Sequence, residues 1–146
     1  MRIALFVVAL AACSPSKQSN SISDEEARKL LIDRNWLDRM PETMHDRLHV
    51  YRFVPSMGGG VFQDRTLYKG TFELFMFETH GDEIRFNLPQ TDEKVISKFH
   101  IEAVDGPKPF DLKLTVHNDP RGPSVYYGMR SETDRDGHLL EQRLHR

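Results

Sequence analysis

Short runs in which apolar and polar residues alternate constrain the fold of this chain more than any other feature of its sequence. Residues 84–88, with the sequence Ile-Arg-Phe-Asn-Leu, alternate without a break, and residues 48–54 and 110–117 follow the same pattern. A period of two sends successive side chains to opposite faces of a strand. The pattern therefore predicts strands that are buried on one face and wet on the other.

Four further runs have the composition of strands: residues 61–69, 71–79, 94–104 and 124–132. The breaks between the runs consist of turn-forming residues, namely Gly58-Gly59-Gly60, Gly70, His80-Gly81-Asp82, Pro89-Gln90-Thr91, Gly106-Pro107-Lys108-Pro109 and Asp119-Pro120-Arg121-Gly122-Pro123. Short turns leave no room for the crossovers that parallel strands require. We therefore expect a mainly β fold, an antiparallel meander of seven strands.

The residues before and after this meander have other patterns. Ser23 can cap a helix, the acidic residues 24–26 favour its first turn, and Ala27, Leu30 and Leu31 share one face, which predicts a helix over residues 24–33. The tail, residues 131–146, is either an eighth strand at residues 138–144 or a closing helix.

The first twelve residues have the layout of a secretory signal. Met1 and Arg2 precede the apolar run Ile3–Leu10, and Ala11 and Ala12 follow it. The apolar run is about ten residues long, half of the roughly twenty that a membrane-spanning helix needs. We expect residues 1–12 to be a signal peptide that is removed.

The cleavage region, Leu10-Ala11-Ala12-Cys13, resembles the lipobox of bacterial lipoproteins at all four positions. The resemblance implies cleavage between Ala12 and Cys13 and attachment of fatty acyl chains, such as palmitate, to Cys13. Two or three acyl chains give lasting membrane attachment, whereas one gives marginal binding. Ser14 follows the cysteine, which resembles the sorting signal for the outer membrane, so we expect a lipid-anchored envelope protein that faces the periplasm or the cell surface.

Composition limits what lies beyond the anchor. Residues 13–23 are polar apart from Cys13 and Ile22 and predict a flexible tether, and residues 24–146 have the length of one domain. The chain has 20 basic and 22 acidic residues with no basic cluster, so we expect no nucleic-acid partner. Cys13 is the sole cysteine, so the sequence offers no intramolecular disulfide and no cysteine nucleophile.

An N-terminal helix, the tripeptide Asn35-Trp36-Leu37, a run of meander strands and a closing Tyr126-Tyr127-Gly128 segment together resemble the small lipocalin-like β-barrels of bacterial lipoproteins. The resemblance covers roughly residues 30–130. It departs from the family at Arg34, where a glycine usually stands two positions before the tryptophan. It implies a barrel with an interior able to hold one small apolar ligand.

Glu73 is the one carboxylate that stands among large apolar residues, within the sequence Thr-Phe-Glu-Leu-Phe-Met-Phe. Alternation places it on the same face as Phe75 and Phe77. We expect it to pair with an arginine such as Arg52 or Arg65, and an alternative role is to orient a ligand. The candidate ligand pocket comprises Glu73, Phe72, Phe86, Phe99, Phe110 and Tyr127, although aromatic residues in strands belong first to the core.

Other motifs favour structure over chemistry. His45 and His49 have the spacing of helical metal ligands, but a strand begins near Leu48, so we expect no metal site and no cofactor. Gly58-Gly59-Gly60 precedes a strand and not a helix, which favours a hairpin over a phosphate-binding loop. No nucleophile motif is present in the sequence, so we expect no enzyme.

Two functions fit these expectations. The first is a lipid-anchored module that holds a small apolar ligand inside a β-barrel, which requires an internal void. The second is a structural or protein-interaction module of the cell envelope, which requires a packed interior and an exposed apolar patch.

Overall fold

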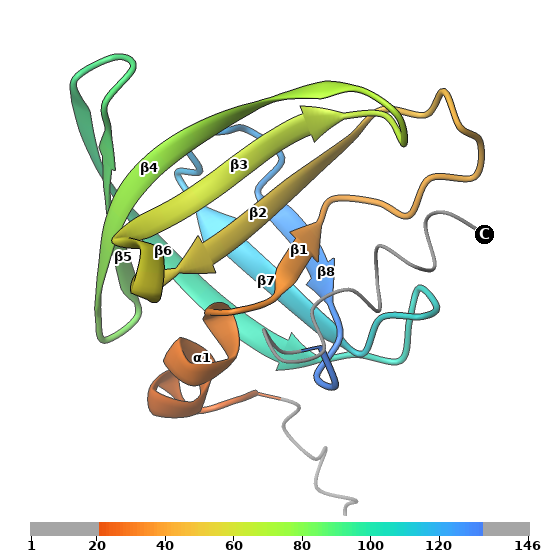
Figure 1. Ribbon diagram of the computed structural model, residues 1–146. Helices are drawn as coiled ribbons and strands as arrows, with labels where there is room; N and C mark the ends of the chain where they lie inside the picture. Colours follow the sequence, from red (N-terminus) through yellow and green to blue (C-terminus); the bar gives the residue numbers. More distant parts are fainter. Residues whose placement is uncertain (1–20, 133–146) are drawn as a thin grey trace, which may run out of the picture.

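The computed structural model describes residues 21–132, which form a closed antiparallel β-barrel with one α-helix. The elements are α1 (Asp24–Leu31), β1 (Asn35–Leu37), β2 (Leu48–Val54), the 3-10 turn η1 (Pro55–Met57), β3 (Gly59–Arg65), β4 (Gly70–His80), β5 (Glu83–Leu88), β6 (Glu93–Ala103), β7 (Leu112–His117) and β8 (Val125–Gly128). Each strand pairs with the next along the chain, and β1 pairs with β8 to close the barrel. The predicted mainly β meander is confirmed (Figure 1).

The barrel has eight strands where the sequence predicted seven. The additional strand is β1, whose three residues are all buried. Such a strand shows no alternation, which is why the pattern did not reveal it. Trp36 of β1 donates a hydrogen bond from Nε1 to the Leu31 carbonyl oxygen at 2.9 Å, and a side chain at Gly128 would place its Cβ 2.9 Å from the Trp36 ring. Trp36 and Gly128 thus pack together where the first and last strands close the barrel.

The predicted helix is present, but it ends at Leu31 and not at Asp33. Its cap is confirmed, since the Ser23 hydroxyl accepts a hydrogen bond from the Glu26 amide at 3.3 Å. Ala27, Leu30 and Leu31 form its buried face. The predicted tether is too long at its inner end, because Ser21 forms an isolated β-bridge with Glu102, and Ile22 packs on the core.

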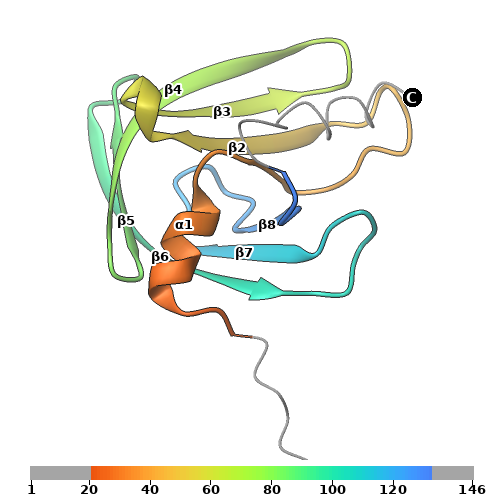
Figure 2. The ribbon, with the colours of Figure 1, turned by 60° about the horizontal axis from the view of Figure 1, so that its bottom comes forward.

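α1 covers one end of the barrel. Arg28 of α1 donates a hydrogen bond to the carbonyl oxygen of Gly81 in the turn between β4 and β5 at 3.1 Å. Because consecutive strands run in opposite directions, their connections alternate between the two ends. The opposite end, here called the mouth, is formed by residues 38–47, 66–69, 89–92 and 118–124. Figure 1 shows α1 at the closed end, away from these connections, and in Figure 2 this end comes forward.

Aromatic side chains fill the interior. Tyr51 lies at the centre, with its ring centroid 4.9 Å from that of Phe62, 5.0 Å from Tyr126 and 5.6 Å from Phe75. The Phe75 centroid lies 5.5 Å from that of Phe86, within the range of favourable aromatic packing. All five of these side chains are buried.

A second, smaller core lies on the outer face of β1 and β2. It contains Leu37, Leu48, Val50, Phe110 and Met129, all of them buried. β2 is therefore covered on both faces along part of its length, although its alternation predicted one wet face. Residues 1–20 and 133–146 lie outside the described residues, and with them the predicted signal peptide, the Cys13 anchor, most of the tether and the alternatives for the tail.

Candidate functional site

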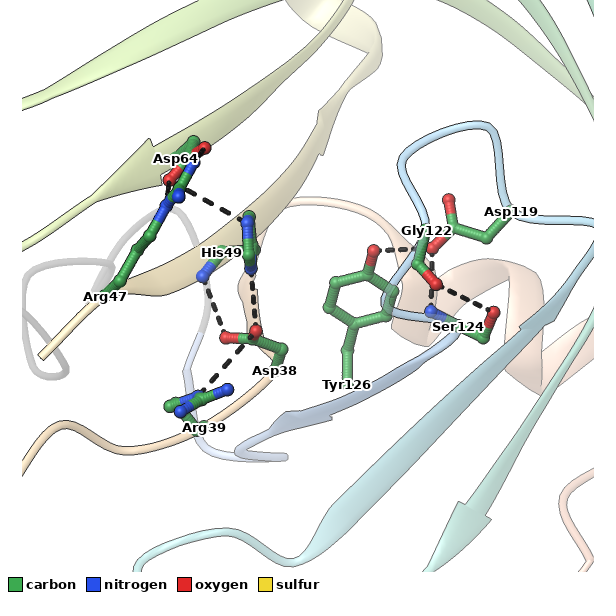
Figure 3. A network of polar contacts seen from close by, with 9 residues as sticks. All are labelled: Asp38, Arg39, Arg47, His49, Asp64, Asp119, Gly122, Ser124 and Tyr126. Carbon is green, nitrogen blue, oxygen red and sulfur yellow. Dashed lines mark hydrogen bonds and ion pairs between the residues drawn. The ribbon is translucent and has the colours of Figure 1, made fainter.

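The mouth carries a connected polar network, and Asp119 is its centre. Asp119 belongs to the loop of residues 118–124, here called the mouth loop, which connects β7 and β8. Its carboxylate accepts hydrogen bonds from the phenols of Tyr51 at 2.9 Å and Tyr126 at 2.6 Å. It also accepts hydrogen bonds from the backbone amides of Arg121 and Ser124, both at 2.9 Å. Figure 3 shows the contacts with Tyr126 and Ser124. One carboxylate therefore fixes the loop and joins it to the aromatic interior.

The two phenols beside Asp119 stay protonated. Burial, followed by the negative charge of Asp119 and the hydrogen bond to it, raises the pKa of Tyr51 far above its ordinary value. The same causes raise the pKa of Tyr126. Both groups therefore act as hydrogen-bond donors and not as bases or nucleophiles at physiological pH.

Arg121 extends the mouth loop toward the inner face of β4. Its guanidinium forms an ion pair with Glu73 and lies 5.3 Å from the centre of the Phe62 ring. Its Nε and Nη2 are buried and have no hydrogen-bond partner among residues 21–132. The Glu73 side chain is 45% exposed, so this pair closes the mouth at its edge.

His49 lies between two carboxylates on the other side of the mouth (Figure 3). Its Nδ1 is 2.8 Å from Asp38 and its Nε2 is 3.8 Å from Asp64, while its ring stacks on Phe62. Arg47 pairs with Asp64, and this hydrogen-bonded pair holds the pKa of the Asp64 carboxyl below its usual range. Both ring nitrogens of His49 thus face carboxylates that orient it.

An open groove of about 630 Å³ lies beside these groups, lined partly by Asp38, Arg39, His49, Arg121 and Tyr127. Its charges are of mixed sign and most of them are already paired. Within residues 21–132, no group of three His, Cys, Asp or Glu side chains is arranged to hold a metal ion. His45, the other histidine of the predicted metal spacing, is exposed in the connection between β1 and β2. The polar groups of the mouth close it over the aromatic interior.

The structure brings only part of the predicted ligand pocket together. Glu73, Phe86 and Phe99 belong to strands whose inner faces line the barrel, and both phenylalanines are core residues. Phe110 and Tyr127 lie instead at the second core outside the barrel, with ring centroids 5.8 Å apart.

Phe72 is a wrong prediction, because its side chain is 70% exposed. Its neighbour Glu73 points inward, and the period of two sends adjacent side chains to opposite faces. The predicted arginine partner of Glu73 was also wrong, since Arg121 and neither Arg52 nor Arg65 forms the ion pair.

Sequence reasoning missed Asp119 and Arg121. Both lie in Asp-Pro-Arg-Gly-Pro, which indicated a turn and nothing more. Their partners are far away in the sequence, as Arg121 and Glu73 are 48 positions apart. No local pattern carries that information.

The outside of the barrel presents an apolar row along β4. Phe72, Leu74 and Met76 alternate along this strand with side chains 70%, 54% and 47% exposed. Met57 of η1 and Ile96 of β6 are also exposed, at 78% and 56%. An exposed apolar row of this kind marks an interaction surface more often than isolated apolar residues do.

Comparison with known proteins gives no relative. No protein-family model, no curated protein and no solved structure matches the chain. Among the helices of residues 21–132, none is long and apolar enough to cross a membrane.

Proposed function

We propose that this chain is a lipid-anchored bacterial envelope lipoprotein without enzymatic activity, whose barrel is a filled scaffold that binds another envelope protein through its outer surface. The observation that carries this proposal is the packed aromatic interior, in the space a small ligand would need. There Tyr51 contacts Phe62, Phe75 and Tyr126, and Phe75 contacts Phe86. A module of this kind requires a packed interior and an exposed apolar patch, and the row on β4 supplies the patch.

The arrangement of the mouth supports the same choice over a carrier of a small apolar ligand. A ligand that entered from the mouth would have to displace the mouth loop. That displacement would break the bonds from Tyr51 and Tyr126 to Asp119 and separate Arg121 from Glu73. Each buried donor left without a partner costs about 1–3 kcal/mol.

The anchor rests on the sequence Leu10-Ala11-Ala12-Cys13 and the short apolar run before it. Acylation of Cys13 would hold the barrel at a membrane without any membrane-binding face of its own. The outer membrane, with the barrel in the periplasm or at the cell surface, is the destination that Ser14 favours.

The anchor is tested by labelling with a radioactive or clickable fatty acid in a bacterium that processes lipoproteins. The parent chain and the control Ser16→Ala should incorporate the label and lose the leader. Cys13→Ser should do neither and should accumulate as the longer precursor. Label in Cys13→Ser, or none in the parent chain, would contradict the proposal.

A further inference from the structure

The half of β4 nearest the mouth has a strand on one side only. Residues Gly70–Phe75 pair with β3, whereas β5 pairs with β4 from Met76 to His80. From Gly70 to Phe75, no described strand pairs with the second edge of β4. Figure 1 shows the tip of the β5–β6 hairpin apart from this part of β4. A free strand edge presents unpaired backbone donors and acceptors to any extended chain that approaches it.

One contact shows which backbone groups face this free edge. The side-chain amide of Gln90, at the tip of the β5–β6 hairpin, donates a hydrogen bond to the Leu74 carbonyl oxygen at 3.0 Å. In an antiparallel strand, the amide and carbonyl of one residue point to the same side, and so do those of the residue two positions away. Leu74 and Phe72 therefore direct their backbone groups away from β3, toward the gap that the Gln90 side chain spans.

The same residues present their side chains on the outside of the barrel. Phe72, Leu74 and Met76 form the apolar row described above, and a groove of about 290 Å³ crosses β4 beside them. Its lining includes Met57 of η1 and Pro89 of the β5–β6 hairpin. Methionine side chains adapt to differently shaped apolar groups, so this groove suits one side chain of a strand laid along the edge.

Charge distinguishes one end of this edge. From Arg65 to Phe72 the chain contains Arg65 and Lys69 but no carboxylate. Lys69 is exposed. An acidic residue of a partner would meet the exposed Lys69 where β3 turns into β4, beside the positive charge of Arg65, whose guanidinium donates to the carbonyl oxygens of Thr66 and Leu67.

From these observations we propose that the free edge of β4 binds an extended segment of another envelope protein by strand addition. The segment has apolar side chains at alternate positions, which lie against Phe72, Leu74 and Met76, and an acidic residue near Arg65 and Lys69. Main-chain hydrogen bonds supply affinity in this mode of recognition, and the groove supplies specificity. This inference rests on the proposed function, since it names the surface and the kind of partner.

A second copy of the chain fits the edge less well. The gap lies between β4 and the β5–β6 hairpin and is spanned by the single side chain of Gln90. A single extended segment has only to displace that side chain from the Leu74 carbonyl oxygen, whereas two barrels joined through β4 would each have to accommodate the hairpin of the other.

The test uses the unlipidated chain from Ser14 to Arg146, which contains the whole described barrel. The probes are synthetic peptides of alternating threonine and valine that end in two aspartates, with the central valine kept or replaced by leucine, methionine or phenylalanine. We expect saturable binding of at least one peptide below about 1 mM, and slower amide hydrogen exchange at Phe72 by about tenfold or more. Proline at the centre of the peptide should abolish binding.

Two variants and a control locate the binding. Phe72→Pro removes an amide that faces the gap and spares the ladder to β3, and Leu74→Lys places a charge in the row. Each should weaken binding about tenfold or more. Met44→Lys, at an apolar side chain 49% exposed in the β1–β2 connection, should leave binding unchanged. Circular dichroism of each variant verifies that it is folded.

Three results would overturn the inference: no peptide binds, the peptides bind all variants equally, or sedimentation reveals a dimer that Phe72→Pro abolishes. The last result would make a second copy the occupant of the edge. Because the peptide assay contains no lipid, an absence of peptide binding says nothing about the acylation of Cys13. In the same way, an absence of fatty-acid labelling says nothing about binding at the edge of β4.

Discussion

At the scale of single residues, the carboxylate of Asp119 connects the surface of the mouth to the aromatic interior. It accepts hydrogen bonds from two phenols and two backbone amides. The loop that carries it also places Arg121 beside Glu73, with which Arg121 forms an ion pair. A hydrogen bond to a charged group contributes about 1.5–3 kcal/mol, roughly twice the contribution of a neutral one. The hydrogen bonds that close the mouth thus converge on one side chain.

Asp119→Ala should therefore lower the free energy of unfolding by about 3 kcal/mol, because it leaves two buried phenol donors without their acceptor. Urea unfolding followed by circular dichroism measures the change. The matched control is Asp105→Ala, since Asp105 is 97% exposed and pairs only with Lys108 among the interactions found for it. That control should change stability by less than about 0.5 kcal/mol. Equal losses of unfolding free energy in the two variants would mean that the Asp119 carboxylate contributes no more to stability than an exposed carboxylate.

The raised pKa values of Tyr51 and Tyr126 predict how stability changes in alkali. Folding raises the pKa of both phenols, so above the ordinary tyrosine pKa the unfolded state binds fewer protons than the folded state. Stability is then fully present below that pH and falls as the pH rises further. Urea unfolding between pH 8 and pH 11, values chosen to bracket a tyrosine pKa of about 10, should show this fall.

The double variant Tyr51→Phe/Tyr126→Phe supplies the control for the alkaline experiment. It should unfold with a smaller dependence on pH over the same range, and it should leave the phenolate absorbance of the folded protein unchanged. A fall in that absorbance would mean that one of the two phenols already ionises in the folded state.

At the scale of elements, α1 and the short β1 determine how the closed end is built. The capped helix places Ala27, Leu30 and Leu31 on the core, and the chain then enters β1 with Trp36 bonded back to Leu31. Helix caps contribute to stability because they satisfy an amide that has no partner inside the helix.

Ser23→Ala should lower the free energy of unfolding by about 1 kcal/mol, since it removes the acceptor for the Glu26 amide. Chemical denaturation measures it, with Ser131→Ala as the control at an exposed serine. A loss in the control as large as in Ser23→Ala would mean that the cap contributes nothing of its own.

The alternating runs predicted the elements well because period two is a local property. β2 was predicted with its bounds, and β4, β5 and β6 were each predicted to within one residue at either end. β8 is shorter than predicted and ends at Gly128. β1 was missed because three buried residues carry no period, and the pairing of β1 with β8 depends on contacts across the whole chain.

The candidate site could be predicted only in part, for the same reason. Alternation correctly placed Glu73 on the inner face of its strand, but it should also have excluded Phe72 from a pocket that contains Glu73. The partner of Glu73 comes from a loop, where no periodic pattern operates. Local patterns predict the face on which a side chain lies, and the closed barrel determines what it meets there.

At the scale of the whole molecule, the distinction between a carrier and a scaffold depends on how the barrel is filled. The interior rings are in contact, and Tyr51 at their centre contacts five others, those of Phe53, Phe62, Phe75, Phe86 and Tyr126. A close-packed interior loses both transfer energy and contacts when one large group is removed.

Phe86→Ala should therefore lower the free energy of unfolding by about 3–5 kcal/mol and create an apolar void. A dry apolar cavity of that kind binds small apolar molecules. Benzene should raise the melting temperature of Phe86→Ala and leave that of the parent protein unchanged. Stabilisation of the parent protein by benzene would reveal a void that is already present.

The most direct test of the account is native mass spectrometry of the chain from Ser14 to Arg146, produced in the periplasm of its own cell and examined before and after extraction with organic solvent. A filled scaffold that acts through its surface predicts the mass of the polypeptide alone in both spectra. A small molecule bound at one copy per chain and released by extraction would contradict it, and would make the barrel a carrier.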